Sequence, residues 1–289
     1  MKQDRLFLTA GFMPAVVMAA FLLLESLRQN GVLPQNIWIL AAAEVAVYLV
    51  PMAVLRFLPN SEGKRARFRF KGYKRQTVPF VLWMSLAASL LAALLNSAVS
   101  SLLGQASSSG WNASAGISGV WWQALLVAVL LPAVVEELFF RGVLFSALES
   151  CGTWPALILS SAAFAMIHGD LHNFAGPLAA GMIYGYMTYV LDSVWPAVFA
   201  HLLNNGLALF LSGAAKTYSA LGLWPYILLI AVFCFCMFLA LAMRTLESQM
   251  EKGRIRRLQY QNPGAALTGI LVSPGIWLLV ILFALRVLY

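Results

Sequence analysis

Charged residues are scarce in this sequence. Asp, Glu, Lys and Arg make up 10% of its 289 residues, whereas soluble domains carry about 25%. Hydrophobic residues make up 61%, against the usual ~45–50%. The sequence also lacks internal repeats, low-complexity tracts and any segment with the composition of a soluble domain. This composition excludes an ordinary soluble protein and indicates a polytopic membrane protein.

Cysteine motifs and the common zinc-protease motif are missing as well. The three cysteines, Cys151, Cys234 and Cys236, form neither a C-x-x-C pair nor a metal-finger pattern, so we interpret them as structural. The motif H-E-x-x-H is absent. The apolar run from Phe7 to Leu24 exceeds the ~7–15 residues of a signal-peptide core and has no small-x-small cleavage site, so we expect a retained first span.

Nine apolar stretches follow one another along the chain. Most approach the ~20 residues that a helix needs to cross ~30 Å of hydrocarbon, while the fifth to the seventh are shorter. We therefore predict an all-α fold, a polytopic transmembrane helical bundle with eight or nine membrane spans. The stretches are 6–27, 37–57, 77–99, 121–148, 154–168, 174–191, 195–211, 225–243 and 267–288.

The basic residues predict the orientation of these spans. The segment Arg56–Arg75 holds eight basic residues and one acid, and Arg244–Arg257 holds five basic residues and two acids. Both segments follow even-numbered spans, so nine helices place them on one face, which the positive-inside rule makes cytosolic. The N-terminus is then cytosolic. Because topology explains the net charge of +8, no nucleic-acid partner is implied.

Charged side chains inside the fourth stretch are the main indication of function, because a charge in hydrocarbon must be paired or used. Glu137 and Arg141 are four residues apart with the acid first, the favoured orientation for a helical ion pair. Glu136 points about 100° away from Glu137 and stays free for chemistry. Pro132 lacks an N–H, so it leaves the Ala128 carbonyl unpaired and predicts a kink one turn before Glu136.

Two further stretches carry polar side chains. Phe164 and His168 are four residues apart in the fifth stretch, and His201 and Asn205 are four apart in the seventh, with Asn204 on another side of the helix. Each histidine alone could serve as an interhelical hydrogen-bond donor. Together, however, Glu, two His and Asn form the set that water activation and oxyanion stabilisation require.

Other polar residues have simpler interpretations. Glu44, alone in the second stretch, is interpreted as a packing or interface carboxylate. His172 lies in a polar turn and is a reserve candidate for the site, and Asp192 and Glu149 are interpreted as boundary residues. The pattern Gly181-x-x-x-Gly185 predicts a small-residue face for close helix packing.

The ordered motifs resemble a known family. Glu136-Glu137-x-x-x-Arg141, Phe164-x-x-x-His168 and His201-x-x-x-Asn205, the last preceded by Asp192-Ser-Val-Trp-Pro196, resemble the type II CAAX prenyl endopeptidase and bacteriocin-processing (CPBP) family of intramembrane proteases, also called the ABI family. The resemblance covers about residues 120–210. We accordingly divide the chain into N-terminal spans (1–119, with a basic cytosolic loop at 58–76), a protease-like catalytic core (120–212) and C-terminal spans (213–289).

The resemblance implies a role for each residue. Glu136 would be the general base that activates water, and His168 would hold that water. His201 and Asn205 would donate to the oxyanion of the tetrahedral intermediate. The ion pair of Glu137 with Arg141 would shape the site.

Members of the family that the motifs resemble are often called metalloproteases, so the resemblance leaves a metal ion open. Glu136, His168 and His201 would be the ligands if Zn²⁺ binds. The missing H-E-x-x-H motif and the poor affinity of Asn for zinc favour hydrolysis without a metal. The cofactor therefore stays open at this point, with metal-independent hydrolysis preferred.

The partners expected are the lipid bilayer and a membrane-associated peptide or protein substrate, prenylated or bacteriocin-like. We expect an integral protein of a prokaryotic plasma membrane. Two alternatives stay open: a non-catalytic membrane scaffold or bacteriocin-immunity protein that retains the fold, and a transporter with a proton-relay carboxylate. The sequence indicates neither the identity of the substrate nor the oligomeric state.

Overall fold

The computed structural model describes residues 5–34, 36–59, 63, 65–104, 121–149, 152–220, 222–258 and 273–288. Within these ranges the ordered segments are helices, with one isolated bridge between Pro59 and Arg65 and no β-strand. The all-α prediction is confirmed. Cys151 lies outside the described residues.

Each of the nine apolar stretches corresponds to a helix or a helical rod in the described part of the chain. The helices are α1 (Arg5–Gln29), α2 (Ile37–Phe57), α3 (Val78–Leu103), α4 (Trp121–Ala124), α5 (Leu131–Glu137), α6 (Phe145–Leu148), α7 (Thr153–Ile167), α8 (Ala175–Leu191), α9 (Trp195–Ala220), α10 (Trp224–Glu251) and α12 (Pro274–Leu288). Helices α9 and α10 extend beyond the predicted stretches, to Ala220 and Glu251. The apolar sequence stops earlier than the helical hydrogen bonding does. The segment 267–272, predicted to open the last span, lies outside the described residues.

Five of the described helical bodies are long and apolar enough to cross a membrane. They are Leu8–Gln29, Ile37–Phe57, Arg75–Leu103, Trp121–Leu148 and Trp224–Glu251. Three further apolar helices are shorter, namely α7, residues 195–211 and α12. The chain is therefore an integral membrane protein with the polytopic helical bundle expected from its sequence.

The fourth stretch is one helical rod whose hydrogen-bond pattern changes along its length. Two π-helical segments, η3 (Leu125–Leu130) and η4 (Leu138–Leu144), flank α5. Pro132 lies in the first turn of α5, directly after η3. Short π-helical turns inside α-helices are rare and occur frequently at functional sites. The backbone hydrogen-bond pattern therefore changes beside Pro132, and the kink expected there stays a prediction.

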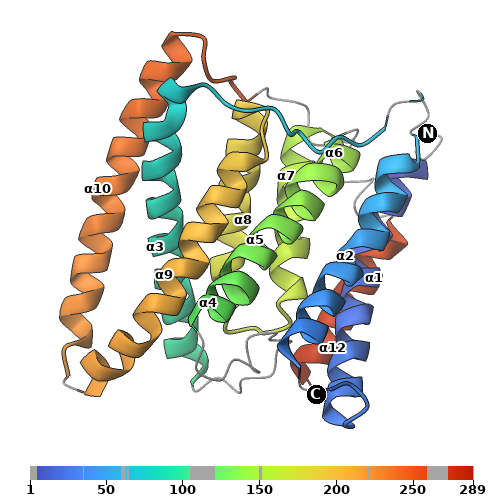
Figure 1. The fold of residues 1–289 in the computed structure, drawn as a ribbon. Helices are drawn as coiled ribbons and strands as arrows, with labels where there is room; N and C mark the ends of the chain where they lie inside the picture. Colours follow the sequence, from blue (N-terminus) through green and yellow to red (C-terminus); the bar gives the residue numbers. More distant parts are fainter. Residues whose placement is uncertain are drawn as a thin grey trace.

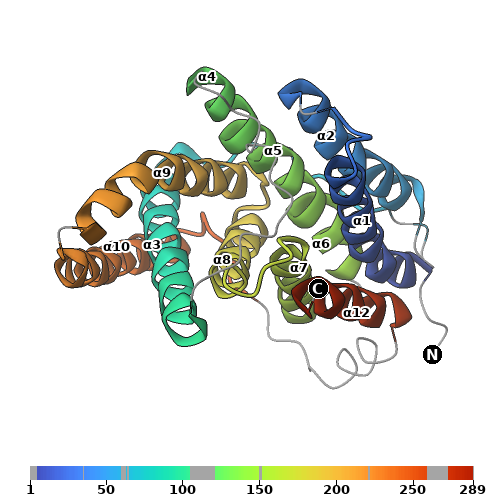
Figure 2. The ribbon, with the colours of Figure 1, turned by 90° about the horizontal axis from the view of Figure 1, so that it is seen from below.

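The helices stand side by side in one bundle, as Figure 1 shows. Helix α10 packs on α3 at one side, and α12 packs on α1 at the other. Seen from below in Figure 2, α7 and α8 lie between these two outer pairs. Only 6% of the most apolar window of α10 is buried, so this helix presents its apolar side chains outward, as expected for contact with lipid.

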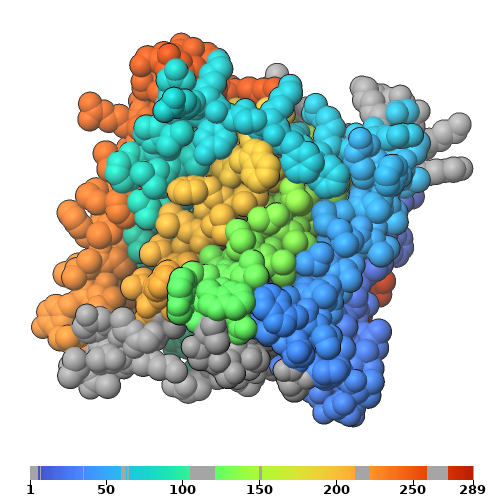
Figure 3. Space-filling model, in the orientation of Figure 1, coloured from blue at the N-terminus to red at the C-terminus, as the bar shows by residue number. Residues whose placement is uncertain are grey.

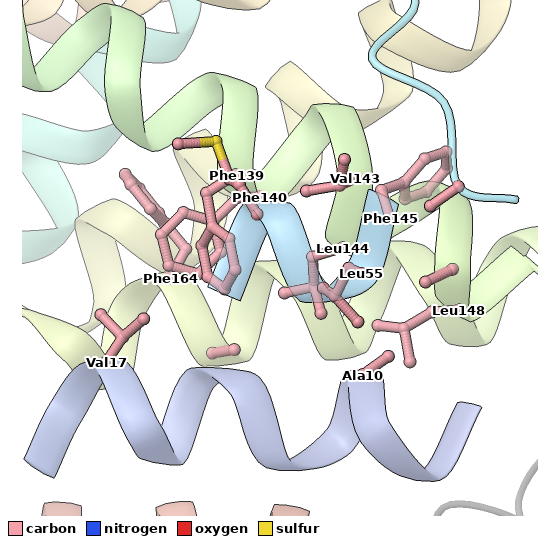
Figure 4. Close-up of a cluster of buried hydrophobic side chains, with 14 of the residues drawn as sticks. Ala10, Val17, Leu55, Phe139, Phe140, Val143, Leu144, Phe145, Leu148 and Phe164 are labelled. Carbon is pink, nitrogen blue, oxygen red and sulfur yellow. The ribbon is translucent and has the colours of Figure 1, made fainter. Parts of the chain in front are cut away.

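Aromatic rings pack among aliphatic side chains in the buried core between α1, α2, η4 and α7. Phe139 and Phe140 meet edge to face with ring centroids 4.9 Å apart, and Phe140 meets Phe164 in the same way at 5.2 Å. Figure 4 shows these rings with the aliphatic side chains that surround them. Edge-to-face packing is a favoured aromatic geometry, and it fixes the rod that carries the two carboxylates.

A basic segment crosses one end of the bundle. Residues 66–74, which we call the basic strap, run without helix or strand over the helix ends, seen in cyan at the top of Figures 1 and 3. Its backbone bonds to the bundle: the Arg69 carbonyl accepts from Val194 N at 3.0 Å, and the Phe70 carbonyl accepts from Trp195 Nε1 at 3.1 Å. The strap is thereby attached to the start of α9.

Ion pairs add to this attachment. Arg69 pairs with Glu149 and approaches Asp192 at 3.8 Å, and Arg256 donates to Asp192 at 3.1 Å. Glu149 and Asp192 lie at helix ends, as their interpretation as boundary residues predicted. Because Arg69 and Arg256 meet at one carboxylate, the two basic segments of the sequence lie at the same end of the bundle.

Candidate active site

A cavity of about 640 Å³ opens inside the bundle. Side chains from α1, α2, α3, α5, α7, α8 and α9 line it. Glu136, His168, His201 and Asn205 are all among the lining residues. The structure therefore brings together the four groups that the sequence predicts for water activation and oxyanion stabilisation, although they come from three helices.

The other carboxylate, that of Glu137, is not among the groups that line this cavity. Glu137 and Arg141 are 0% exposed, and Arg141 Nη1 donates to Glu137 Oε1 at 2.9 Å. The predicted ion pair is thus present, and Glu136 takes no part in it. One residue of helical rotation, about 100°, separates the buried carboxylate from the carboxylate that reaches the cavity.

Aromatic rings surround the buried guanidinium. The Arg141 Cζ atom lies 4.2 Å from the centre of the Phe164 ring and 5.5 Å from that of Tyr184. A Cβ atom added at Gly181 would lie 2.9 Å from Arg141 Nη2, so the glycine makes room for the guanidinium. A planar cation stacked on rings is better suited to burial than a strongly hydrated ammonium. The spacing of Gly181 and Gly185 predicted close helix packing, and the short distance at Gly181 agrees with this prediction.

His168 ends α7 and is held by its own helix. Its Nδ1 lies 2.8 Å from the carbonyl oxygen of Phe164, four residues earlier. A carbonyl only accepts, so Nδ1 carries the proton and Nε2 keeps its lone pair. The spacing Phe164-x-x-x-His168 therefore has a structural basis, and the free Nε2 can accept a hydrogen bond from water.

His201 joins the buried pair to the cavity. Its Nδ1 lies 2.8 Å from Glu137 Oε1, the same oxygen that Arg141 contacts. The carboxylate accepts the Nδ1 proton, so Nε2 is an acceptor in neutral His201 and a donor only in the imidazolium. The oxyanion role predicted for His201 therefore requires the charged ring, a condition that the sequence alone did not reveal.

Asn205 contacts the distorted rod. Its Nδ2 donates to the Ala128 carbonyl at 3.4 Å. Pro132 cannot bond this carbonyl, and a polar side chain of a neighbouring helix takes its place, as membrane helices with proline commonly arrange. The amide keeps a second N–H that can donate into the cavity. Asn204 also lines the cavity and donates to Asn205 Oδ1 at 3.3 Å.

Sequence reasoning missed several lining residues. Glu44 and Tyr48 of α2 line the cavity, as do Asn96 of α3 and Tyr184 of α8. Glu44, interpreted from the sequence as a packing or interface carboxylate, lies at the cavity. Its spacing of four from Tyr48 is the one local sign that both face the same way.

The reserve candidate His172 does not belong to the lining. It stays in the turn before α8, where its Nδ1 lies 3.3 Å from Asp170 Oδ1. Asp170 also accepts from the backbone N–H of His172 at 2.9 Å. The histidine is thus part of a local turn, as a loop residue would be.

The geometry does not provide a ready metal site. Across the part of the chain that the structure describes, no group of three His, Cys, Asp or Glu side chains is gathered closely enough to hold a metal ion. Glu136, His168 and His201, the ligands considered from the sequence, share the cavity without forming such a group. The residues therefore do not fit a three-ligand zinc site.

Comparison with known proteins identifies the segment that carries this site. Residues 117–207 match the family model for Rce1-like type II CAAX prenyl endopeptidases. A Bacillus subtilis (strain 168) protein named "Putative membrane peptidase YdiL" is 29% identical over 82 residues, which cover 28% of this chain and 34% of that relative. The chain thus aligns with about a third of the length of this curated relative. No solved structure matches the chain significantly. The resemblance to the CAAX protease family is confirmed over the matched segment.

Proposed function

We propose that this chain is an intramembrane endopeptidase in which Glu136 activates a water molecule to hydrolyse a peptide bond. One observation carries the proposal: Glu136, His168, His201 and Asn205 line one cavity, while the neighbouring carboxylate is committed to a buried ion pair. The family match over residues 117–207 supports the reaction type. The substrate we propose is a membrane-associated peptide or protein, because apolar helices enclose the cavity.

The chemistry begins with the water. Glu136 accepts one proton as the water oxygen attacks the carbonyl carbon, and His168 Nε2 orients the water by accepting a hydrogen bond from it. Holding water and carbonyl together in one cavity turns a bimolecular encounter into a positioned reaction.

The tetrahedral intermediate then needs donors for its oxyanion. The free N–H of Asn205 donates without any change of protonation, and His201 donates from Nε2 as the imidazolium. When the C–N bond breaks, the proton held by Glu136 passes to the leaving amine nitrogen. Glu136 returns to the carboxylate, and the products are one carboxylic acid and one amine.

The test compares Glu136→Gln with the wild type. The amide keeps the shape of the side chain and removes the base, so cleavage should fall by roughly 10²- to 10⁴-fold. Membrane peptides from cells that express either form would be compared by mass spectrometry. A peptide that accumulates uncut only with the variant would identify both substrate and scissile bond.

Matched histidine variants serve as controls for this experiment. His168→Gln removes the imidazole that orients the water and should lower cleavage strongly, whereas His172→Gln alters a turn outside the cavity and should not. Full biological activity in Glu136→Gln would refute the proposal and favour a non-catalytic scaffold or immunity protein. Loss of proton coupling without any cleaved product would instead indicate a transporter.

The distribution of basic residues supports a proposal for the orientation of the bundle in the membrane. We propose that the end with the basic strap is cytosolic, since both basic segments meet there. The N-terminus then also lies in the cytosol. Labelling of a single cysteine introduced at exposed Lys71 by a membrane-impermeant reagent would test it: protection in intact cells agrees with the proposal, and labelling contradicts it.

A further inference from the structure

A second carboxylate reaches the cavity from a helix outside the family match. Glu44 of α2 is 5% exposed and lines the cavity with Glu136. It makes no ion pair or hydrogen bond with any residue that the structure describes. A buried carboxylate with no partner carries a large desolvation cost. Glu44 is thus a buried carboxylate at the proposed site that no ion pair or hydrogen bond with a described residue explains.

Two carboxylates, Glu44 and Glu136, face the cavity, against the single imidazolium of His201 that the proposed mechanism requires, so the charge around the cavity is negative in excess. None of the described residues that line it is Lys or Arg. The guanidinium of Arg141 is buried and paired with Glu137, and neither residue is among those that line the cavity. A cleft in which one sign of charge is in excess raises the local concentration of ligands of the opposite sign. The cavity therefore favours a cationic group.

Tyr48, one helical turn beyond Glu44, adds a directed hydroxyl. The side chain is 0% exposed, and its hydroxyl has no hydrogen-bond partner of ordinary length among the described residues. The ring is fixed by Phe139 at 5.5 Å and by Phe21 at 5.7 Å between centroids. The hydroxyl is thus held beside Glu136, where it interacts with that carboxylate and lies within electrostatic range of Glu44.

We propose that Glu44 forms a cation subsite, with Glu44 as the specificity-determining residue that binds a Lys or Arg side chain of the substrate near the scissile bond. This inference rests on the proposed function. The cavity volume of about 640 Å³ lies within the range of ligand pockets, about 300–1,000 Å³, so a short peptide segment fits. The substrate cation compensates the buried carboxylate of Glu44.

The test uses the purified full chain in lipid nanodiscs and a peptide mixture that retains internal Lys and Arg. Mass spectrometry of the products should show Lys or Arg enriched at one fixed position beside the cut. Two synthetic peptides, with Lys or Gln at that position, then give the ratio of their kcat/KM values. Glu44→Gln should lower this ratio about 10- to 100-fold, the value of a hydrogen bond to a charged group.

A matched control uses another buried carboxylate. Glu25 of α1 is paired with Arg28 and lies outside this cavity, so Glu25→Gln should keep the wild-type ratio. No enrichment of Lys or Arg in the wild type would overturn the subsite. A Glu44→Gln variant that loses activity on both peptides equally would overturn it as well, because that result indicates a structural role.

A binding measurement separates this inference from the proposed function. The Glu136→Gln protein is titrated with the Lys and the Gln peptide in the absence of cleavage. Tighter binding of the Lys peptide, lost when Glu44→Gln is added, supports the subsite even if the wild type cleaves nothing. Equal binding of the two peptides refutes the subsite even if the wild type cleaves both.

Discussion

Two neighbouring carboxylates of α5 occupy opposite environments. Glu137 is fully buried, with Arg141 Nη1 at 2.9 Å and His201 Nδ1 at 2.8 Å from the same oxygen. Glu136 opens into a cavity of about 640 Å³ together with His168. The helix rotation of about 100° per residue is enough to separate a bracing group from a group available for chemistry. We call the buried surroundings of Glu137 the closed side and the cavity that Glu136 faces the open side. Substitutions on the closed side should therefore lower stability, and substitutions on the open side should lower activity.

Glu137→Gln should have the largest effect on stability. It leaves the guanidinium of Arg141 buried without its counter-charge, and breaking a buried pair on one side costs about 3–5 kcal/mol. Denaturant unfolding in detergent micelles would measure the loss. Glu136→Gln is the matched control and should change stability by less than about 1 kcal/mol, since it breaks no pair. Equal destabilisation by the two variants would remove the contrast between the two sides.

Gly181→Ala tests the closed side by crowding it. The added Cβ would lie 2.9 Å from Arg141 Nη2 and 3.1 Å from Ser161 Cβ. Overpacking of this kind costs about 1–3 kcal/mol. Thermal unfolding in detergent would measure it against Gly206→Ala, whose Cβ would have Val129 Cγ1 as its nearest neighbour at 4.0 Å. A Gly181→Ala protein as stable as the Gly206→Ala protein would show that the guanidinium moves freely.

The open and closed sides differ in how far the sequence could predict them. Helical periodicity predicted the pairing of Glu137 with Arg141 and the independence of Glu136, because both depend only on positions along one helix. The nine helical segments followed from apolar run length for the same local reason. The contact between His201 and Glu137 joins residues 64 apart, and no local pattern specifies it.

Glu44 shows where local reasoning ends. A single carboxylate in an otherwise apolar helix has the same pattern whether it faces a neighbour, a cavity or the membrane surface. The packing of α2 against the rod that carries Glu136 decides among these, and that packing depends on side chains such as Tyr48 and Phe139. The roles of the site residues and the division of the chain into three parts stay predictions.

Tyr184→Phe probes the boundary between the two sides. The hydroxyl donates to the Ala200 carbonyl at 3.3 Å, while the ring stacks on His201 at 5.9 Å between centroids. The substitution keeps the ring and removes a neutral hydrogen bond, so stability should fall by about 0.5–1.5 kcal/mol. Denaturant unfolding would measure it, with Tyr186→Phe on the same helix as control. A larger loss, close to that of Glu137→Gln, would mean that the hydroxyl belongs to the buried charge network.

Arg256→Gln should have the smallest effect on stability. It extends the comparison to an ion pair of the same kind that is exposed to solvent. Arg256 and Asp192 form a pair like that of Arg141 with Glu137, with 3.1 Å between the atoms, but the arginine side chain is 59% exposed. Exposed pairs contribute about 0–1 kcal/mol, since solvent screens the charges. Unfolding in detergent at low and high salt would measure a small loss that shrinks as salt rises. A loss as large as that of Glu137→Gln would show that attachment of the basic strap, rather than burial of the central pair, determines the stability of the bundle.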